Sequence, residues 1–596
     1  MLKRLTNNLV LTTLRRARFL LTRDEKRRGI GMVIVSLISI LVDVAGLALL
    51  VPLMMAATDQ KFVEDNETMA WLLQFLGGGD YGKLLVMMAV VVLVVFLLKN
   101  AFTLLVGNWQ SRFIWDVATN LARRQYMKYY GRGFTYFKQT SSSDIVNNII
   151  NIPVFFASGV LTSLINFLTE FSVLTFIIVS IALIDPILFI ALLLVLAPSG
   201  FLIYGGTKNR LYSLGKKQQT FGAKNYARIQ QAIFGFVDVR LTNKEEVFLD
   251  GYVAGQRDLN NTFRQKYLIS LIPSKGLEVM AVLGIVVIFG YSYFVSKTTE
   301  GIFEFVAVFA AAAFRVLPSM NRSLAALMGM KNQMASLDEL EDGFLPVKMD
   351  NIEAKPMDYE KTIEFKDLSF QFDDADGKGY ALRNINFKVK KGEKIGLIGE
   401  SGSGKTTLMN ILLRFLVESD GGIYVDGKKL ELEDIASWRA KIGYVQQQVF
   451  LVDGTLRENI AFGEKPDEVN DAQVMSALEQ SSLLEFVKTL PNGVNTQVGE
   501  MGSRLSGGQR QRIGIARALY YKSEVLVFDE ATSALDTETE NSITESINAI
   551  GADKTVFVIA HRITTLKSCE RIFELKDGKV AAVWNYDDLI KDRVLK

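Results

Sequence analysis

Cysteine and histidine are almost absent from this chain. Cys569 is the only cysteine and His561 the only histidine among 596 residues. A single cysteine excludes a disulfide within the chain, and the scarcity of both residue types excludes a metal site built from Cys/His clusters. The chain also lacks a large excess of charge of either sign, because its formal net charge is only +3. This balance gives no electrostatic indication of a nucleic-acid partner.

Apolar residues, in contrast, are abundant. They make up 49% of the chain, which is high for a soluble protein and indicates membrane-spanning segments. A length of 596 residues is also too great for one hydrophobic core, so at least two domains are expected.

Six apolar stretches are long enough to cross a membrane as helices. We expect them at 30–57, 84–106, 160–184, 187–204, 268–295 and from about 302 onward. Lysine and arginine are in excess before the first stretch, after the second and after the fourth. By the positive-inside rule, this pattern places both chain ends in the cytoplasm. The long basic segments 110–150 and 207–266 are expected to continue the spans as cytoplasmic helices.

The first 28 residues combine leucines with lysines and arginines. This composition favours an amphipathic helix in the membrane interface, with basic side chains toward anionic headgroups, over a solvated helix. At the other end of the apolar half, residues 343–359 contain Pro346 and Pro356 and indicate a linker. From Thr362 onward the pattern changes to short strands alternating with helices, which predicts an α/β domain.

A glycine-rich stretch in this second half fits the pattern G-x-x-x-x-G-K-[ST]. It lies between an apolar run at 394–398, expected as a strand, and an expected helix from 408, which is the context that a phosphate-binding loop requires. Glycines let backbone N–H groups surround a phosphate at a helix N-terminus. The expected nucleotide-binding residues are Gly399, Glu400, Ser401, Gly402, Ser403, Gly404, Lys405, Thr406 and Thr407. Lys405 would reach the β- and γ-phosphates, and Thr406 would hold Mg²⁺.

A pair of acidic residues ends a second apolar run, at 525–528. Asp529 at the end of this expected strand is placed to hold Mg²⁺, mostly through water. Glu530 follows it directly. A solvated strand end is the alternative interpretation of this pair, but the apolar run and the upstream phosphate-binding loop favour a site.

The order of these motifs resembles the ATP-binding cassette (ABC) family. The resemblance rests on Leu505-Ser506-Gly507-Gly508-Gln509, on the run 525–530 and on Ser533-Ala534-Leu535-Asp536. It implies a membrane α-helical domain with six transmembrane helices and long cytoplasmic extensions, followed by an α/β P-loop ATPase domain. We expect these domains at 1–345 and 346–596. The implied ligands are ATP and Mg²⁺.

The resemblance also implies roles for individual residues. Glu530 would be the general base that polarises the attacking water. His561 would contact the γ-phosphate, although a lone histidine is more often structural. Gln447, rather than Gln446 or Gln448, would be the metal-contacting glutamine, and Phe372, with Tyr380 as the alternative, would stack on adenine.

The family architecture implies that the signature residues serve a second subunit. Ser506, Gly507, Gly508 and Gln509 precede an expected helix, and in the family they complete the nucleotide site of the partner, together with Asp536. The active unit would then be a homodimer. The stretch Thr496 to Gly502 resembles the X-loop of exporters, and short coupling helices are expected near 141–148 and 234–242.

The expected substrate follows from a short stretch of the sixth apolar segment. Residues 310–322 resemble the corresponding stretch of flippases for lipid-linked oligosaccharides. Arg315 in this stretch, and Lys275 and Glu278 in the fifth, are ionisable residues in apolar surroundings and are candidate substrate contacts. For Arg315, snorkelling to the interface or a structural pair with Glu278 is the alternative.

The sequence therefore predicts an ATPase that translocates a substance across the plasma (inner) membrane of a bacterium, with its ATPase domain in the cytoplasm. The favoured substrate is an amphipathic, anionic, lipid-linked oligosaccharide, and the partners are a second copy, the lipid and the membrane, with no nucleic acid. A lipid A or multidrug-type exporter is the alternative within the class. An ATP-gated channel or a regulatory membrane ATPase is the alternative outside it.

Overall fold

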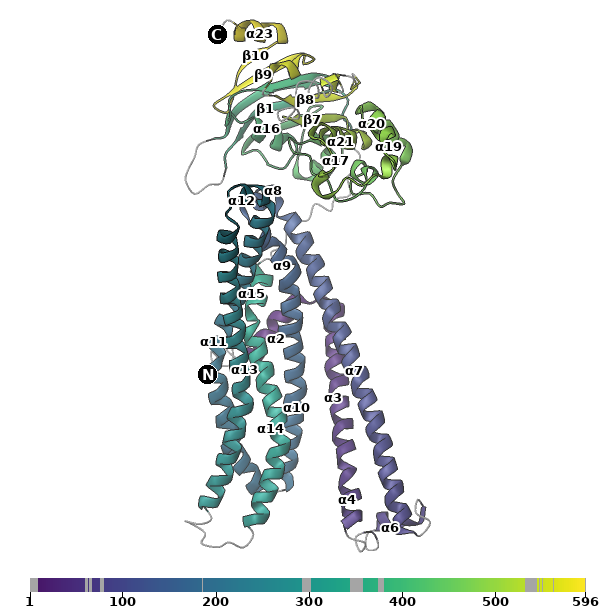
Figure 1. Ribbon diagram of the computed structural model, residues 1–596, viewed down its shortest axis with the longest axis vertical. Coiled ribbons are helices and arrows are strands. Elements are labelled where there is room, and N and C mark those ends of the chain that lie inside the picture. The colour runs from purple at the N-terminus through teal and green to yellow at the C-terminus, as the bar shows by residue number, and fades with distance from the viewer. Residues whose placement is uncertain are drawn as a thin grey trace. The chain divides into compact units, whose positions relative to one another are not determined.

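The chain divides into two compact units in the computed structural model (Figure 1). The structure describes residues 9–594 except 59–62, 64–66, 76–79, 185, 292–301, 343–356, 373–379, 531–543, 546, 549, 552 and 561. The first unit contains 1–132 and 139–347, and the second contains 133–138 and 348–596.

The first unit is a bundle of long helices (Figure 1). Its N-terminal part contains α2 (Leu9–Leu20), α3 (Arg23–Ala48), α4 (Leu50–Thr58), α6 (Glu67–Phe75) and α7 (Tyr81–Gly131). It continues with α9 (Ser142–Phe155), the π-helical turn η1 (Phe156–Leu161), α10 (Thr162–Ile184) and α11 (Pro186–Phe234). It ends with α12 (Phe236–Leu241), α13 (Glu245–Tyr291), α14 (Ile302–Asn332) and α15 (Met334–Asp342).

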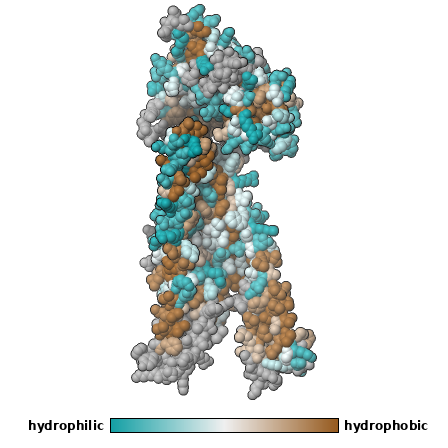
Figure 2. Space-filling view, viewed as in Figure 1, coloured by the Kyte–Doolittle hydropathy of each residue, from teal (hydrophilic) through white to brown (hydrophobic). Residues whose placement is uncertain are grey.

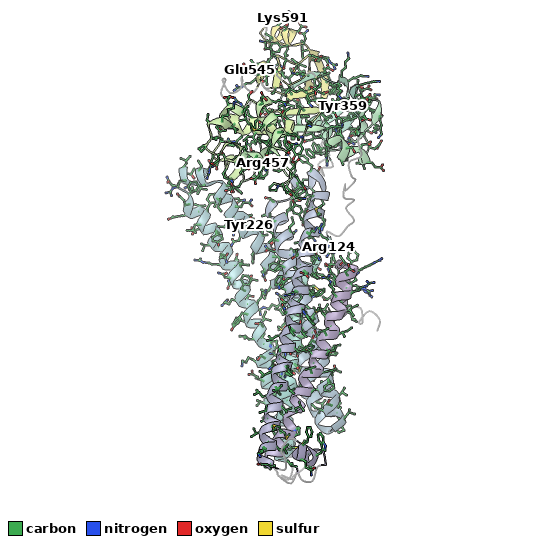
Figure 3. The ribbon with its side chains drawn as sticks, turned by 90° about the vertical axis from the view of Figure 1, so that its right-hand side faces the viewer. Arg124, Tyr226, Tyr359, Arg457, Glu545 and Lys591 are labelled. Carbon is green, nitrogen blue, oxygen red and sulfur yellow. The ribbon has the colours of Figure 1, made fainter. Side chains whose placement is uncertain are left out.

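Polar side chains fix the start of several of these helices. Thr22 and Glu25 form reciprocal hydrogen bonds at the start of α3, where the Thr22 N–H donates to Glu25 Oε2 at 2.7 Å and the Glu25 N–H donates to Thr22 Oγ1 at 3.2 Å. Arg124 of α7, labelled in Figure 3, donates to the carbonyl oxygen of Leu20 at 2.7 Å and to Glu25 Oε2 at 3.3 Å. These contacts join α2, α3 and α7.

The long helices extend well beyond the predicted apolar stretches. Helix α7 has 51 residues, and at ~1.5 Å per residue it far exceeds the ~30 Å of a bilayer core. Three helical segments in the described part of the chain are long and apolar enough to cross a membrane, at Tyr81–Gly131, Ser142–Leu183 and Glu245–Val286. Figure 2 shows an apolar surface over the ends of α3 and α7 that lie farthest from α12.

The first expected coupling helix lies elsewhere than predicted. Residues 141–148 form the start of α9, and the short helix is instead α8 (Gly133–Gln139). Gly133 has a φ of +79°, a backbone conformation that favours glycine and ends α7. Residues 133–138 belong to the second unit, where the Phe134 ring stacks on Phe415 with centroids 5.2 Å apart. The second expected position, 234–242, contains α12, whose Phe236, Val237 and Leu241 are exposed.

The second unit is an α/β domain with two sheets. The antiparallel sheet has the order β2-β1-β4-β5, and the six-stranded sheet has the order β10-β9-β3-β8-β7-β6. In the larger sheet, β9, β3, β8, β7 and β6 are parallel and β10 is an antiparallel edge. The strands are β1 (Thr362–Phe370), β2 (Leu382–Lys390), β3 (Lys394–Ile398), β4 (Asp420–Val425), β5 (Lys428–Lys429), β6 (Ile442–Val445), β7 (Val525–Asp529), β8 (Thr555–Ile559), β9 (Arg571–Lys576) and β10 (Lys579–Trp584).

Helices cover these sheets and carry the motifs. They are α16 (Lys405–Leu412), α17 (Ile435–Arg439), α18 (Leu456–Ile460), α19 (Asp471–Gln480), α20 (Leu484–Thr489), α21 (Gly507–Tyr520) and α23 (Tyr586–Val594). The central strands are buried on both faces, with Val525 to Phe528 and Val556 fully inaccessible, as expected for a parallel sheet. Buried Tyr359, labelled in Figure 3, shares a hydrogen bond of 2.6 Å with Thr555 Oγ1 at the start of β8.

Candidate active site

The predicted phosphate-binding loop connects β3 to α16, as the sequence predicts. Gly399 and Gly404 have φ angles of +148° and +103°. A Cβ atom at Gly399 would lie 2.2 Å from the carbonyl oxygen of Leu575, so this position has no room for a side chain. The loop therefore approaches its neighbours closely enough to require glycine.

Two side chains of this loop fit a phosphate ligand. The buried Lys405 side chain donates from Nζ to the carbonyl oxygens of Gly399 at 2.8 Å and Glu400 at 2.9 Å. Burial lowers the pKa of Lys405, and the nearby carboxylates Glu530 and Asp529 partly oppose this shift. Ser403 Oγ is buried and has no hydrogen-bond partner among the described residues. An ammonium group and a free hydroxyl beside a helix N-terminus are suited to a phosphate. Glu400, Ser401 and Thr406 are exposed at the same loop.

The acidic end of β7 lies beside the adjacent strand β6. The Tyr444 hydroxyl donates to Asp529 Oδ2 at 2.9 Å. Burial, and secondly the negative charge of Asp529, raise the pKa of Tyr444, so the phenol remains a donor. This contact orients Asp529, and the sequence analysis did not identify it. Among the described residues no cluster of three or more Asp, Glu, His or Cys side chains is placed to hold a metal ion.

Gln447 and Glu530 lie together in the structure. Gln447 Nε2 donates to Glu530 Oε2 at 2.9 Å, and all three glutamines, Gln446, Gln447 and Gln448, are exposed. Glu530 has a φ of +49°, an uncommon conformation for a residue with a side chain, and its backbone N–H donates to the carbonyl oxygen of Ile559 at 3.0 Å. The two expected functional residues from different strand ends are thus brought into direct contact.

The signature residues begin helix α21. Ser506 is the N-cap, its Oγ accepting from the Gln509 N–H at 3.3 Å while Gln509 Oε1 accepts from the Ser506 N–H at 2.9 Å. From the same helix, Gln511 Nε2 donates to the carbonyl oxygen of Gln447 at 2.6 Å. The signature helix is therefore bonded to the glutamine loop of its own chain. No hydrogen bond among the described residues joins Ser506 to the phosphate-binding loop.

The remaining nucleotide-site predictions have different positions. Phe372 is 41% exposed at the end of the antiparallel sheet and makes an edge-to-face contact with Phe370, with centroids 4.9 Å apart. Tyr380 is exposed to a similar extent and lies 5.9 Å from the Arg383 guanidinium. Both rings are open to stacking. His561 and Asp536 lie outside the described residues.

Two of the three candidate substrate residues contact each other. Lys275 and Glu278, on one face of α13, pair with each other at 3.0 Å. Arg315 lies in α14, and its side chain is outside what the structure describes. A different pair joins α14 to α10: Arg322 Nε lies 2.5 Å from Glu170 Oε1. Glu170 is an acidic residue inside the apolar stretch 160–184, and this position was the sign in the sequence that it needs a basic partner.

Comparisons with known proteins agree with this geometry. The model of the family described as "ABC transporter" matches residues 382–533. The ATP-dependent lipid A-core flippase of Polaromonas sp. strain JS666 is 32% identical over 476 residues, which are 76% of this chain and 77% of that protein. The ABC-type transporter fsqE of Aspergillus fumigatus is 40% identical over 231 residues, 39% of this chain and 18% of that protein.

A solved structure shares the fold. The structure of a bacterial Atm1-family ABC exporter with ATP bound superposes with a TM-score of 0.77 at 21% identity, covering 95% of this chain and 97% of that one. The match extends over both units, so the fused arrangement of helical and ATPase parts in one chain is common to both proteins.

Proposed function

We infer the function of this chain from its family: it belongs to the ABC transporter family, and its ATPase domain couples ATP hydrolysis to transport. We propose that two copies form an exporter or flippase that moves an amphipathic lipid with an anionic head across the membrane. The contact between Gln447 and Glu530 at the end of β7 is the observation that carries the ATPase part of this proposal.

Each described residue of the site has a role that its position supports, whereas the role of His561 rests on the family resemblance alone. The loop N–H groups, Ser403 and Lys405 would hold the phosphates, and Thr406 and Asp529 would hold a Mg²⁺ ion, which would supply positive charge beside the phosphates. Glu530 accepts a proton from the attacking water as general base. Gln447 orients the Glu530 carboxylate, and Tyr444 orients Asp529. Phe372 stacks on the adenine, and His561 contacts the γ-phosphate.

The signature residues support a dimer with shared sites. Ser506 and Gly507 lie at the N-terminus of α21, a helix of 14 residues, and this N-terminus is suited to a γ-phosphate. Among the described residues they make no hydrogen bond to the phosphate-binding loop of their own chain. A second copy in head-to-tail orientation would receive this N-terminus, together with Asp536. Gln511 of α21 donates a hydrogen bond to the Gln447 carbonyl oxygen. Binding of α21 to a nucleotide in the partner's site could therefore shift the position of Gln447.

The apolar helices support an integral membrane protein. We infer six spans with both chain ends and the ATPase domain in the cytoplasm, in the inner membrane of a bacterium, as the alternation of basic loops favours. The permease part corresponds to 1–345 and the ATPase part to 346–596. Helices α8 and α12 are the candidate coupling helices, since each is a short helix at the turn between two long ones.

Ionised side chains within apolar helices support a charged substrate. Arg322 is 56% exposed although it pairs with Glu170, so its guanidinium remains accessible from one side. Arg315 lies seven residues earlier, on the same face after two helical turns. Arginine suits bidentate binding of phosphate oxygens. We propose that this face of α14 contacts the lipid head, with Lys275 and Glu278 as further candidates.

Two lipids satisfy this description. A lipid-linked oligosaccharide is favoured by the sequence of residues 310–322. Lipid A-core is the second candidate, because a relative that matches 76% of this chain is named for that substrate. Mass spectrometry of the lipids that copurify with the detergent-solubilised protein distinguishes them. A diphosphate-linked glycan supports the first, a phosphorylated glucosamine disaccharide supports the second, and recovery of bulk phospholipids in membrane proportions contradicts both.

A further inference from the structure

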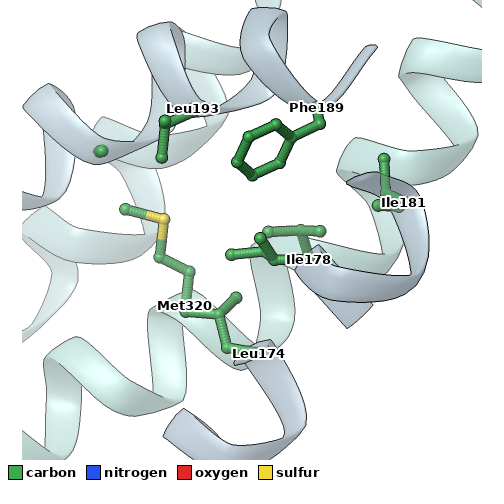
Figure 4. A pocket seen from close by; sticks show the side chains of 8 residues that line it. Leu174, Ile178, Ile181, Phe189, Leu193 and Met320 are labelled. Atoms are coloured by element: carbon green, nitrogen blue, oxygen red, sulfur yellow. The ribbon is translucent and has the colours of Figure 1, made fainter. Parts of the chain in front are cut away.

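An apolar pocket lies between α10, α11 and α14 (Figure 4). We propose that it holds the end of one hydrocarbon chain of a lipid, an inference that rests on the proposed function and extends it to the apolar part of the substrate. The cavity has a volume of about 120 Å³. Leu174, Ile178 and Ile181 line it from α10, Phe189 and Leu193 from α11, and Met320 from α14.

The lining excludes a polar occupant. All lining side chains are apolar, so a headgroup would find no hydrogen-bond partner, and a water molecule needs two to four polar partners. A cavity of ~150 Å³ lined by similar side chains stays dry and binds benzene. The present volume therefore suits the last few carbons of one chain. An α-helix of a second copy, ~10 Å wide, is too large to enter.

Small residues of α11 keep the pocket open. Ala197 is part of the lining, and Gly200 follows it by one helical turn. A Cβ atom at Gly200 would lie 2.6 Å from the terminal methyl group of Met320, so the methionine reaches α11 only because this residue is glycine. Leu193, one of the lining residues, is 46% exposed, so the pocket is not closed off by buried side chains on every side.

The nearest charged pair lies at one end of the pocket. Glu170 precedes Leu174 by one turn of α10 and pairs with Arg322, which lies close to Met320 along α14. Glu170 is 14 residues from the end of α10 at Ile184, or about 21 Å at 1.5 Å per residue. The pocket lies along the part of α10 between these two residues. In the proposed topology Ile184 faces the outside, so the pocket would lie in the outer half of the span.

The free energy of burying each CH₂ group, ~0.8 kcal/mol, would favour lipids whose chains reach the pocket. The pocket would thus select lipids by the length of their hydrocarbon chains, and the charged face of α14 would bind their heads.

Photolabelling of the full-length protein tests this site. The probe is a phosphatidylglycerol with a diazirine at the end of one acyl chain, present in phosphatidylcholine vesicles without nucleotide. The labelled residues are found by peptide mass spectrometry. We expect label on Ile178, Leu193 or Met320 in the unaltered protein. Ala197→Phe fills the pocket and should remove this label, and Ala197→Leu, a smaller change, should reduce it.

Leu194→Phe is the matched control, because Leu194 neighbours the lining on the same helix and is 69% exposed. It should label like the unaltered protein. Three results would each overturn the proposal. They are equal labelling of Ala197→Leu and Leu194→Phe, label spread over the exposed residues of α11, and no label at the pocket. The experiment needs no transport, so a labelled pocket in a protein that flips no lipid would contradict the proposed function and leave the chain site standing.

Discussion

Gln447 Nε2 and Glu530 Oε2 lie 2.9 Å apart, although 83 residues separate them in the chain. The amide donates to the carboxylate, so Glu530 is held at the end of β7. Gln447 is itself anchored through its carbonyl oxygen by Gln511 of the signature helix. Through Gln447, the proposed general base Glu530 is therefore connected to α21, whose N-terminus would complete the nucleotide site of a partner subunit.

Replacement of the proposed base should stop turnover without preventing nucleotide binding. In Glu530→Gln the Gln447 contact can persist, but the amide cannot take a proton from water. We expect kcat to fall ~10²–10⁴-fold with little change in ATP affinity. Steady-state ATPase assays and nucleotide-binding measurements check this. Hydrolysis within a few-fold of the unaltered protein would remove Glu530 from the role.

Loss of the Tyr444 hydroxyl should raise the requirement for Mg²⁺. Tyr444→Phe keeps the ring in the sheet but removes the donor to Asp529, and a hydrogen bond to a charged group contributes ~1.5–3 kcal/mol. We expect the Mg²⁺ concentration for half-maximal ATPase activity to rise about tenfold, with maximal activity largely recovered at saturating Mg²⁺. An unchanged Mg²⁺ dependence would show that Tyr444 does not orient Asp529.

Cysteines in the phosphate-binding loop and the signature should crosslink between chains. Ser401→Cys with Ser506→Cys places one thiol at each half of the proposed shared site, and both positions are exposed. With ATP bound, oxidation should give a covalent dimer on a denaturing gel.

The native cysteine should not interfere with this experiment. Burial raises the pKa of Cys569 to about 12, so almost no thiolate forms at neutral pH and the thiol stays unreactive while the protein is folded. The unaltered protein is the control and should remain monomeric on the gel. Crosslinks formed only within one chain would rule out the shared-site dimer.

Arg315 and Arg322 should respond differently to replacement by alanine. Arg315→Ala should keep a folded protein that has lost stimulation of its ATPase by lipid, and Arg315→Lys should restore this stimulation only in part. Arg322→Ala removes the partner of Glu170, whose carboxylate is 16% exposed, and should lower the thermal unfolding temperature.

The double variant separates these effects. Glu170→Gln in the Arg322→Ala background removes the carboxylate charge that has lost its partner. The double variant should therefore recover most of the lost thermal unfolding temperature, measured by differential scanning fluorimetry. If the double variant is less stable than Arg322→Ala, the pair is not what stabilises the α10 and α14 contact. If Arg315→Ala transports normally, the headgroup role of Arg315 is wrong.

Local spacing was enough to predict much of the ATPase fold. The pattern from Gly399 to Thr407 requires a strand before it and a helix after it, and β3 and α16 lie there. The apolar run before Asp529 is likewise a buried parallel strand. Such features depend on neighbouring residues, so a sequence reveals them directly.

Contacts between distant elements were not predictable in the same way. The pairs of Tyr444 with Asp529 and of Arg322 with Glu170 depend on which strands and helices become neighbours, and a single sequence does not specify this. The short helix α8 lies earlier in the chain than the coupling helix that was predicted near 141–148. Gly131 and Gly133 were the available signal for the helix end.

The movement of lipid by the purified protein tests the account most directly. The protein would be reconstituted into vesicles with a fluorescent lipid-linked oligosaccharide or lipid A, and the fraction of probe reached by a membrane-impermeant quencher would be followed after ATP and Mg²⁺ are added. The account predicts a change in that fraction that requires ATP and is absent in Glu530→Gln. ATP hydrolysis of normal rate with no movement of either lipid, or an ion current opened by ATP, would contradict it.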